Sequence, residues 1–369
     1  MGRKTVAERY KTLKSSRDPY MTRARNAAKL TIPTLIPEEG SNKSTVFVKP
    51  YQSLGARGVN HLSAKLRLLL LPPNNPFWSF RPNNILLNQE MEMLRMLGQE
   101  QEAEALKTDL ETNLAQLENT LLQNIESTQD GAVLNEAFKH LLVAGNVLLV
   151  DTKTGLKYYP LSRYVVNRDY SGNVLEVITE EKVSRLVLGD LIDEIKQGGG
   201  EAKDEELTLY TYLKRTQDNK WEIYQEIDGV IIRQTKGSYP LDRCPFIPLR
   251  YTRIDGENYG RGFVEDLYAD LWTLDKLSQA ITEGSLAAAK LVFFVDPNSY
   301  TDSDELANAE NCAIIDGNAN DVSTLQAAKT YDFATAKEEI HRLNRELSLM
   351  FLLTTGIQRS GDRVNSCPL

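Results

Sequence analysis

The chain has 369 residues, of which 41% are hydrophobic and 25% charged, ordinary proportions for a globular protein. Its formal net charge is −8 and its sequence pI is about 5.2, which argues against a tight nucleic-acid binder, because such domains are usually basic. The charge is unevenly distributed. Residues 1–72 hold 14 Lys/Arg against 4 Asp/Glu, so a basic N-terminal segment precedes an acidic body.

Helices are expected through most of the first 145 residues. A helix over 5–31 ends at Pro33 and another over 52–71 ends at Pro72, because the residue before a proline is driven out of the α region. Three more elements are expected here: a short strand at Trp78 and Phe80, a long charged helix over 88–127 interrupted near Gly98, and a helix over 133–144.

A β-rich region is expected to follow. The turn Tyr170-Ser171-Gly172-Asn173 lies between two strand-like runs and predicts a hairpin, and later turn residues predict a meander. The expected strands are 146–151, 163–169, 174–180, 207–214, 221–226, 230–235 and 246–251, with a helix over 182–197 that ends in three glycines.

Two long amphipathic helices, over 263–289 and 332–353, are predicted near the end of the chain. Their apolar residues recur at spacings of three, four and seven, close to a coiled-coil seam: Val264, Leu267, Leu271, Leu274 and Ile281 in the first, Ile340, Leu343, Leu347 and Met350 in the second. Between them we expect strands over 291–295, 312–315 and 322–325 and a short helix over 302–309. Such a pair is consistent with an ordinary helical hairpin in a core or with the wall of a ring.

No motif of a known catalytic class is present. The sequence has no Gly-x-x-x-x-Gly-Lys-Ser/Thr phosphate loop, no Gly-x-Ser-x-Gly elbow and no His-Glu-x-x-His pair. Weaker candidates each have a structural interpretation that we favour: His61, His140 and His341 as surface or interface residues, Asp302 and Asp304 as a helix cap, and Asp266 and Asp270 as a solvated face. We therefore expect no catalytic residue, no metal site and no cofactor.

Two glycine-containing segments could contact an anion. Gly260-Arg261-Gly262 precedes a helix, and we favour close packing over an anion site there. The loop at 354–363 combines the cations Arg359 and Arg363 with the neutral donors Gln358 and Ser360. Such a loop can contact a phosphate backbone without reading bases, although its composition also suits a mobile solvent loop.

Several blocks of sequence, in order along the chain, resemble the portal, or head-to-tail connector, proteins of short-tailed bacteriophages. The blocks are Tyr10-Lys11-Thr12-Leu13, Arg17-Asp18-Pro19-Tyr20-Met21-Thr22-Arg23-Ala24, Thr31-Ile32-Pro33, Gly55-Ala56-Arg57-Gly58, Leu62-Ser63-Ala64-Lys65-Leu66, Leu142-Val143-Ala144-Gly145-Asn146-Val147-Leu148-Leu149, Ser162-Arg163-Tyr164-Val165-Val166-Asn167-Arg168-Asp169, Gly172-Asn173-Val174-Leu175, Cys244-Pro245-Phe246-Ile247-Pro248, Asp255-Gly256-Glu257-Asn258-Tyr259-Gly260-Arg261 and Gln358-Arg359-Ser360-Gly361-Asp362-Arg363-Val364. Together they are far more specific than any one of them.

This resemblance implies an α+β fold of portal type, divided into named parts. These are a wing over 1–262, helical over 1–145 and β-rich over 146–262; a first stem helix over 263–290; a clip over 291–330; a second stem helix over 331–353; a tunnel-type loop over 354–364; and an atypical tail over 365–369. Gln358, Arg359, Ser360 and Arg363 would then face DNA. The family's C-terminal crown is expected to be absent, as if the chain were truncated.

The implied function is a non-enzymatic portal subunit in a dodecameric ring at one capsid vertex of the virion, assembled in the cytoplasm of the bacterial host. Double-stranded DNA would pass through the ring, without sequence preference, during packaging and ejection. The implied partners are terminase, the major capsid protein, scaffolding protein, and tail and internal core proteins. The three cysteines, Cys244, Cys312 and Cys367, are odd in number and lie far apart without metal-type spacing, which favours a reducing compartment over a disulfide or zinc framework. No apolar run approaches the ~18 to 20 residues that a membrane span needs.

A second interpretation is a DNA-binding or scaffolding virion protein that uses its basic N-terminal segment. Steep dependence of DNA affinity on salt would distinguish such a binding module from a passive conduit.

Overall fold

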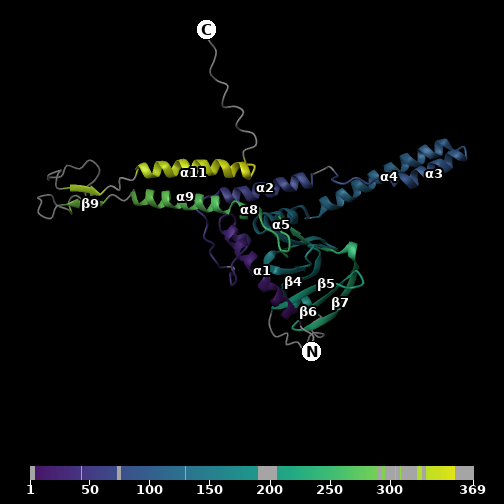
Figure 1. Ribbon diagram of the computed structural model, residues 1–369, viewed down its shortest axis with the longest axis horizontal. Coiled ribbons are helices and arrows are strands. Elements are labelled where there is room, and N and C mark those ends of the chain that lie inside the picture. The colour runs from purple at the N-terminus through teal and green to yellow at the C-terminus, as the bar shows by residue number, and fades with distance from the viewer. Residues whose placement is uncertain are drawn as a thin grey trace, which may run out of the picture.

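The computed structural model describes residues 5–42, 44–72, 76–128, 130–189, 206–288, 292–295, 304, 308, 322–325 and 330–353. The fold is α+β, as predicted, with an elongated outline (Figure 1). A helix pair extends to one side, a second helical hairpin extends to the other, and the three- and five-stranded sheets lie beside the middle.

The helices, in chain order, are α1 (Val6–Lys29), α2 (Leu54–Leu70), α3 (Asn84–Met96), α4 (Glu100–Ser127), α5 (Asp130–Ala144), α6 (Arg185–Leu188), α8 (Phe263–Asp266), α9 (Tyr268–Ala288) and α11 (Thr330–Met350). The strands are β1 (Asn146–Thr152), β2 (Gly155–Pro160), β3 (Tyr164–Arg168), β4 (Val174–Ser184), β5 (Glu206–Arg215), β6 (Lys220–Ile227), β7 (Val230–Pro240), β8 (Phe246–Arg250), β9 (Val292–Val295) and β10 (Val322–Leu325).

Two antiparallel sheets form the β-rich middle of the chain. The five-stranded sheet has the order β3-β4-β5-β6-β7, so the predicted hairpin and meander join in one sheet. The three-stranded sheet has the order β2-β1-β8, and in it Val147 lies opposite Leu249. Strand β8 therefore belongs to the three-stranded sheet, although the strands just before it in sequence, β5 to β7, belong to the five-stranded sheet.

Helix α1 joins the sheets to the helical part of the fold. It begins with a capping box, in which the Thr5 side chain accepts from Glu8 N–H and the Glu8 side chain accepts from Thr5 N–H. Its first half packs on the five-stranded sheet through Val6, Tyr10 and Leu13, and its second half enters the main core. Between the two halves lies Arg17, only 2% exposed.

One nitrogen of the Arg17 guanidinium, Nη1, is surrounded by oxygen acceptors, whereas the buried Nε has no partner among the described residues. Nη1 donates to the carbonyls of Leu161, Ser162 and Tyr164 at 2.9, 3.1 and 2.8 Å and to the Tyr10 hydroxyl at 3.2 Å. A buried guanidinium is tolerated only when such acceptors replace its water. Arg17 thus fixes α1 to the chain segment between the two sheets.

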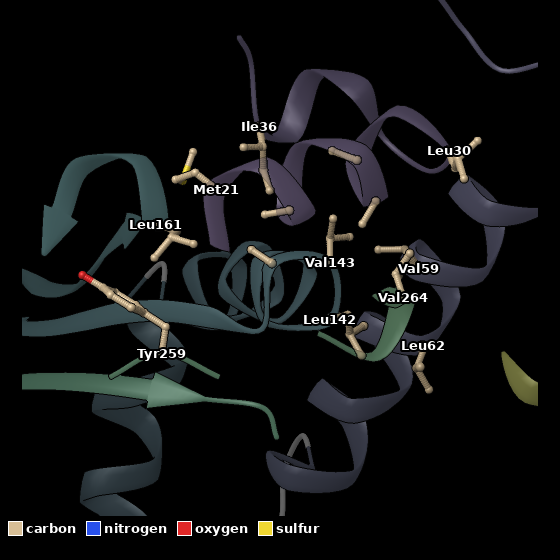
Figure 2. Close-up of a cluster of buried hydrophobic side chains, with 14 of the residues drawn as sticks. Met21, Leu30, Ile36, Val59, Leu62, Leu142, Val143, Leu161, Tyr259 and Val264 are labelled. Atoms are coloured by element: carbon tan, nitrogen blue, oxygen red, sulfur yellow. The ribbon is translucent and has the colours of Figure 1, made fainter. Parts of the chain in front are cut away.

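The main core lies where α1, α2 and α5 meet β1 and α8. Figure 2 shows Val59 and Leu62 of α2 and Leu142 and Val143 of α5 converging with Val264 of α8. All five side chains are at most 8% exposed. This core places the start of the helix pair directly on the body of the protein.

Three sequence predictions are wrong in part. Trp78 and Phe80 form no strand; Pro76 and Pro82 lack the N–H groups of a ladder, and the Phe80 N–H donates to the Glu118 carboxylate. Residues 182–184 belong to β4 rather than to a helix, because Ser184 pairs with Glu206 of β5. The predicted helix over 263–289 is divided at Leu267 into α8 and α9.

The break predicted near Gly98 is confirmed. Gly98 has φ +76° and separates α3 from α4, which fold back on each other through Leu87, Met91 and Ala103. A left-handed residue at this position ends a helix at little cost when it is glycine. Strand β2, by contrast, has no counterpart among the predicted elements.

Candidate nucleic-acid interface and its supports

The four predicted DNA-facing residues, Gln358, Arg359, Ser360 and Arg363, lie outside the described residues. The structure does describe the helix that leads to them and the surface on which that helix ends. Helices α9 and α11 lie side by side, with the paired strands β9 and β10 beyond them (Figure 1). This order of elements is the one that the sequence predicts.

The seam between α9 and α11 is mostly as predicted. Leu271 and Leu274 of α9 and Leu343 and Leu347 of α11 are at most 2% exposed. Met350 is the exception, since it is 57% exposed and Phe351 is buried in its place. Helix α11 ends at Met350, and the turn that follows rotates Phe351 inward.

The turn after α11 has the hydrogen bonds of a Schellman motif. Leu353 N–H donates to Ser348 C=O at 2.8 Å, and Leu352 N–H donates to Leu349 C=O at 3.0 Å. Leu352 takes φ +56°, a left-handed conformation that usually falls to glycine and costs other residues of order 1–3 kcal/mol. A strained residue therefore lies immediately before the predicted loop.

Contacts with α2 and α8 hold this turn in place. Phe351 packs against Gly58 of α2 so closely that a Cβ on Gly58 would lie 2.4 Å from Phe351 Cγ. The Phe351 ring meets the Phe263 ring edge-on at a centroid distance of 5.6 Å, and His61 Nε2 lies 3.1 Å from Leu352 O. Sequence reasoning missed this support. The available signal was the pair Gly55 and Gly58, three positions apart in the predicted helix over 52–71, because glycine inside a helix can allow a close approach of another element.

The Gly260-Arg261-Gly262 segment is a packing device, as favoured from the sequence. A Cβ on Gly262 would lie 2.6 Å from Val143 O, and one on Gly145, which has φ +71°, would lie 2.3 Å from the Arg261 carbonyl carbon. Asn146 bridges the two segments by donating to Gly260 O at 2.9 Å and accepting from Gly260 N–H at 2.7 Å. The start of α8 is therefore fixed to the end of α5.

A strap over residues 36–51 connects the end of α1 to α9. Ile36 is 5% exposed at one end, and at the other end Tyr51 N–H donates to the Asp275 carboxylate at 2.7 Å. A cleft of about 660 Å³ lies between the strap, α1 and α9. Trp272 of α9 lines this cleft and is 48% exposed.

Most of the N-terminal cations that the structure describes are used within the fold. Five of them pair with carboxylates, namely Arg9 with Glu176, Lys14 and Arg25 with Glu39, Arg23 with Glu265, and Lys29 with Glu38. Burial alone would raise the pKa of Glu176, but hydrogen bonds from Arg9, Tyr212 and Asn167 lower it. Two of these pairs reach the acidic body, through Glu176 and Glu265, and three stay within the basic segment, through Glu38 and Glu39, so each of the five cations has a carboxylate partner.

The other weak candidates remain structural. Asp266 and Asp270 are exposed, as expected of a solvated face, and His341 is exposed on α11. His140 is not a surface residue, because it is 4% exposed and its ring packs against that of Tyr158, tilted by 40° at a centroid distance of 5.4 Å. Burial lowers the pKa of His140 to about 4. Asp302 lies outside the described residues, and Asp304 is exposed.

Two kinds of feature are absent from the described part of the chain. No group of three or more His, Cys, Asp or Glu side chains in the described ranges is arranged to hold a metal ion. No described helix has the length and apolar character that a membrane crossing requires.

Comparison with known proteins identifies a family and several relatives. The profile of the bacteriophage head to tail connecting protein family matches residues 3–365. The portal protein of Escherichia phage T7 is 36% identical over 99% of this chain and 67% of its own length, and that of Enterobacteria phage T3 is 35% identical over 97% and 66%. A chain in the neck of a native gene transfer agent particle is 12% identical, with a TM-score of 0.32 over 64% of this chain and 59% of its own length. The chain therefore spans about two thirds of the length of the portal proteins that it matches.

Proposed function

This chain belongs to the bacteriophage head to tail connecting protein family, and on that premise we propose that it is a structural portal subunit of a phage virion. It forms a ring at the capsid vertex, through which double-stranded DNA enters and leaves the head and to which the tail attaches. The observation that carries this proposal is the family match across residues 3–365, which includes the helix pair α9 and α11.

We assign the parts of the subunit as the family resemblance implies. Residues 1–262 form the wing, residues 263–290 and 331–353 the stem helices, and residues 291–330 the clip. The antiparallel pair β9 and β10 between α9 and α11 supports the clip assignment. Residues 354–364 form the tunnel loop, and residues 365–369 the tail that follows it.

We assign the DNA contact to Gln358, Arg359, Ser360 and Arg363. The support is indirect: α11 ends in a turn that is held to α2 by Phe351, so the loop begins from a fixed point. A loop with two cations per subunit contacts phosphates, which carry no sequence information. Because the affinity for DNA rises with the number of phosphates neutralised, few cations bind weakly enough to let DNA slide.

The subunit works as a scaffold and not as an enzyme. Its relatives are portal proteins, which supports this proposal. Terminase supplies the ATPase, and the ring contacts the major capsid protein, scaffolding protein, and tail and internal core proteins. Assembly takes place in the host cytoplasm, and the product is the portal vertex of the virion.

The test is negative-stain microscopy of the purified chain together with a DNA-binding titration at several salt concentrations. We expect rings of twelve copies that bind DNA weakly. Arg359→Ala with Arg363→Ala should leave the rings intact and reduce the slope of log K against log salt, by roughly 0.9 for each phosphate that is no longer neutralised. Chains that stay monomeric at all concentrations would refute the ring.

The alternative of a DNA-binding module in the N-terminal segment is disfavoured by the ion pairs of α1. Lys11→Gln with Lys49→Gln removes two exposed cations of that segment and should leave DNA affinity unchanged. A large loss of affinity in this variant, with no loss in the loop variant, would favour the binding module.

A further inference from the structure

Helix α3 has two apolar faces, and α4 covers only one of them. Leu87, Met91 and Leu94 form the face that packs against α4. Leu86, Met93 and Leu97, which recur at spacings of seven and four, form a stripe on the outer side and are 59%, 62% and 71% exposed. A helix that is apolar on both sides is normally buried on both sides.

The surroundings of this stripe are strongly acidic. Residues 84–128, which comprise α3, α4 and the turn between them, contain nine Asp/Glu and two Lys/Arg, a net charge of −7. We refer to these residues as the arm; it projects from the body of the protein (Figure 1). No described carboxylate of the arm forms an ion pair with a described Lys or Arg, in contrast to the carboxylates that face α1.

Only some of the carboxylates of the arm stabilise its own helices. Glu100 and Glu102 lie in the first turn of α4, where the helix dipole favours carboxylates. Glu104 and Glu111 lie further along the helix and are exposed. Like charges on one helix destabilise it slightly, so the remaining carboxylates point to a role outside the arm.

The same chain carries a surface of the opposite character. Helix α2 has Arg57, Lys65 and Arg67 and no Asp or Glu. At its C-terminal end Leu68, Leu69 and Leu70 are 51%, 71% and 55% exposed, directly beside Lys65 and Arg67. The C-terminal half of α2 is therefore cationic and apolar, whereas the arm is apolar on the outer side of α3 and acidic mainly on α4, which holds seven of its nine carboxylates.

We propose that the outer face of α3 in one copy packs against the C-terminal half of α2 in a neighbouring copy. Leu86, Met93 and Leu97 would cover the exposed leucines of α2, and the acidic arm would face Lys65 and Arg67. Such a contact joins two different surfaces, which is the type of interface that generates rings. A contact between two arms is disfavoured because each carries a charge of −7. This proposal rests on the proposed ring and names one of the surfaces that form it.

Cross-linking between differently tagged copies tests the contact. Cys244, Cys312 and Cys367 are first replaced by Ser. Met93→Cys is then placed in one tagged copy and Leu69→Cys in the other, and the mixture is assembled and treated with a short bismaleimide. We expect a covalent dimer that contains both tags. The matched control replaces Leu69→Cys by Lys153→Cys, an exposed residue in the β1–β2 turn, and should give no such dimer.

A second measurement uses exposed positions, so that failure to fold does not confuse the result. Met93→Ser with Leu97→Ser, and separately Leu69→Ser with Leu70→Ser, should each raise the chain concentration needed for assembly about tenfold or more. Their circular dichroism and melting temperature should match those of the parent chain.

The outcomes separate the contact from the ring. Rings that form with unchanged concentration dependence in both Ser variants, without the Met93–Leu69 cross-link, would overturn the contact and leave the proposed function standing. A cross-link between two Met93→Cys copies would overturn it in favour of contact between arms. Chains that never assemble would refute the ring and the contact together.

Discussion

The ring of Phe351 fills the space beside Gly58 in which any other residue would carry a side chain: a Cβ on Gly58 would lie 2.4 Å from Phe351 Cγ. Phe351 is completely buried there. The end of α11 is thus held against α2 by a contact that only glycine permits, and the chain enters residues 354–364 from this point.

Gly58→Ala should therefore lower the free energy of unfolding by about 1–3 kcal/mol, because the new methyl group must displace an aromatic ring from a packed site. Urea unfolding at neutral pH measures the change. Gly131→Ala in α5 is the matched control: its Cβ would meet only the end of Arg67 at 3.4 Å, so it should stabilise the protein by up to about 1 kcal/mol. Equal effects of the two variants would contradict this account of Gly58.

Leu352→Gly should be neutral or stabilising, by up to about 1 kcal/mol, because glycine adopts φ +56° without the steric cost that leucine bears. Thermal unfolding monitored by circular dichroism is suitable. Leu349→Gly changes another exposed leucine, inside α11, and should instead destabilise the protein by about 1 kcal/mol. A loss of stability in Leu352→Gly as large as in Leu349→Gly would show that Leu352 is unstrained.

The buried His140 should make stability depend on pH between about 4 and 6.5. Its pKa is lower in the folded chain, so the unfolded chain binds more protons in this range and stability falls as pH falls from 6.5 towards 4. The full effect is up to about 3 kcal/mol. His140→Phe removes the titrating group and should therefore reduce this slope. The substitution breaks no hydrogen bond at Nδ1, because that atom has no partner among the described residues. An unchanged slope in urea titrations at several pH values would assign the pH dependence to other groups.

Asp275→Ala should release the strap at its Tyr51 end, because the Tyr51 N–H loses its only observed acceptor in the described structure. Limited proteolysis with chymotrypsin should then cleave after Phe47 faster than in the parent chain. Asp275→Asn keeps an oxygen acceptor at the same place and should stay close to the parent rate. Equally rapid cleavage of the parent chain would show that this hydrogen bond does not restrain the strap.

Local patterns predicted much of this fold, and contacts distant in sequence account for most of what they missed. The spacing of Leu343 and Leu347 identified the buried seam of α11, but the same spacing selected Met350, because it contains no information on where the helix ends. Strand β8 was recognised as a strand, yet its pairing with β1 depends on residues about 100 positions earlier. Residues 182–184 were assigned to a helix because their strand partner, near Glu206, lies across a long connection.

The support for the predicted loop was harder to foresee than the fold. Phe351 follows the last residue of a helix, and nothing in its neighbourhood indicates that Gly58, almost 300 positions earlier, leaves room for its ring. The glycines at 260 and 262 were correctly expected to allow close packing, because they directly precede a helix start.

The half-exposed indole on α9 gives the protein an optical reporter of assembly. Of the three tryptophans, Trp221 is 6% exposed and should emit as a dry indole in the folded chain, Trp78 is half-buried, and Trp272 is 48% exposed and borders the open cleft beneath the strap. Any subunit that packs against this side of α9 will remove water from Trp272, and the emission of the chain will shift to shorter wavelengths. In a Trp78→Phe chain, assembly that covers this side of α9 can therefore be followed in solution without a label.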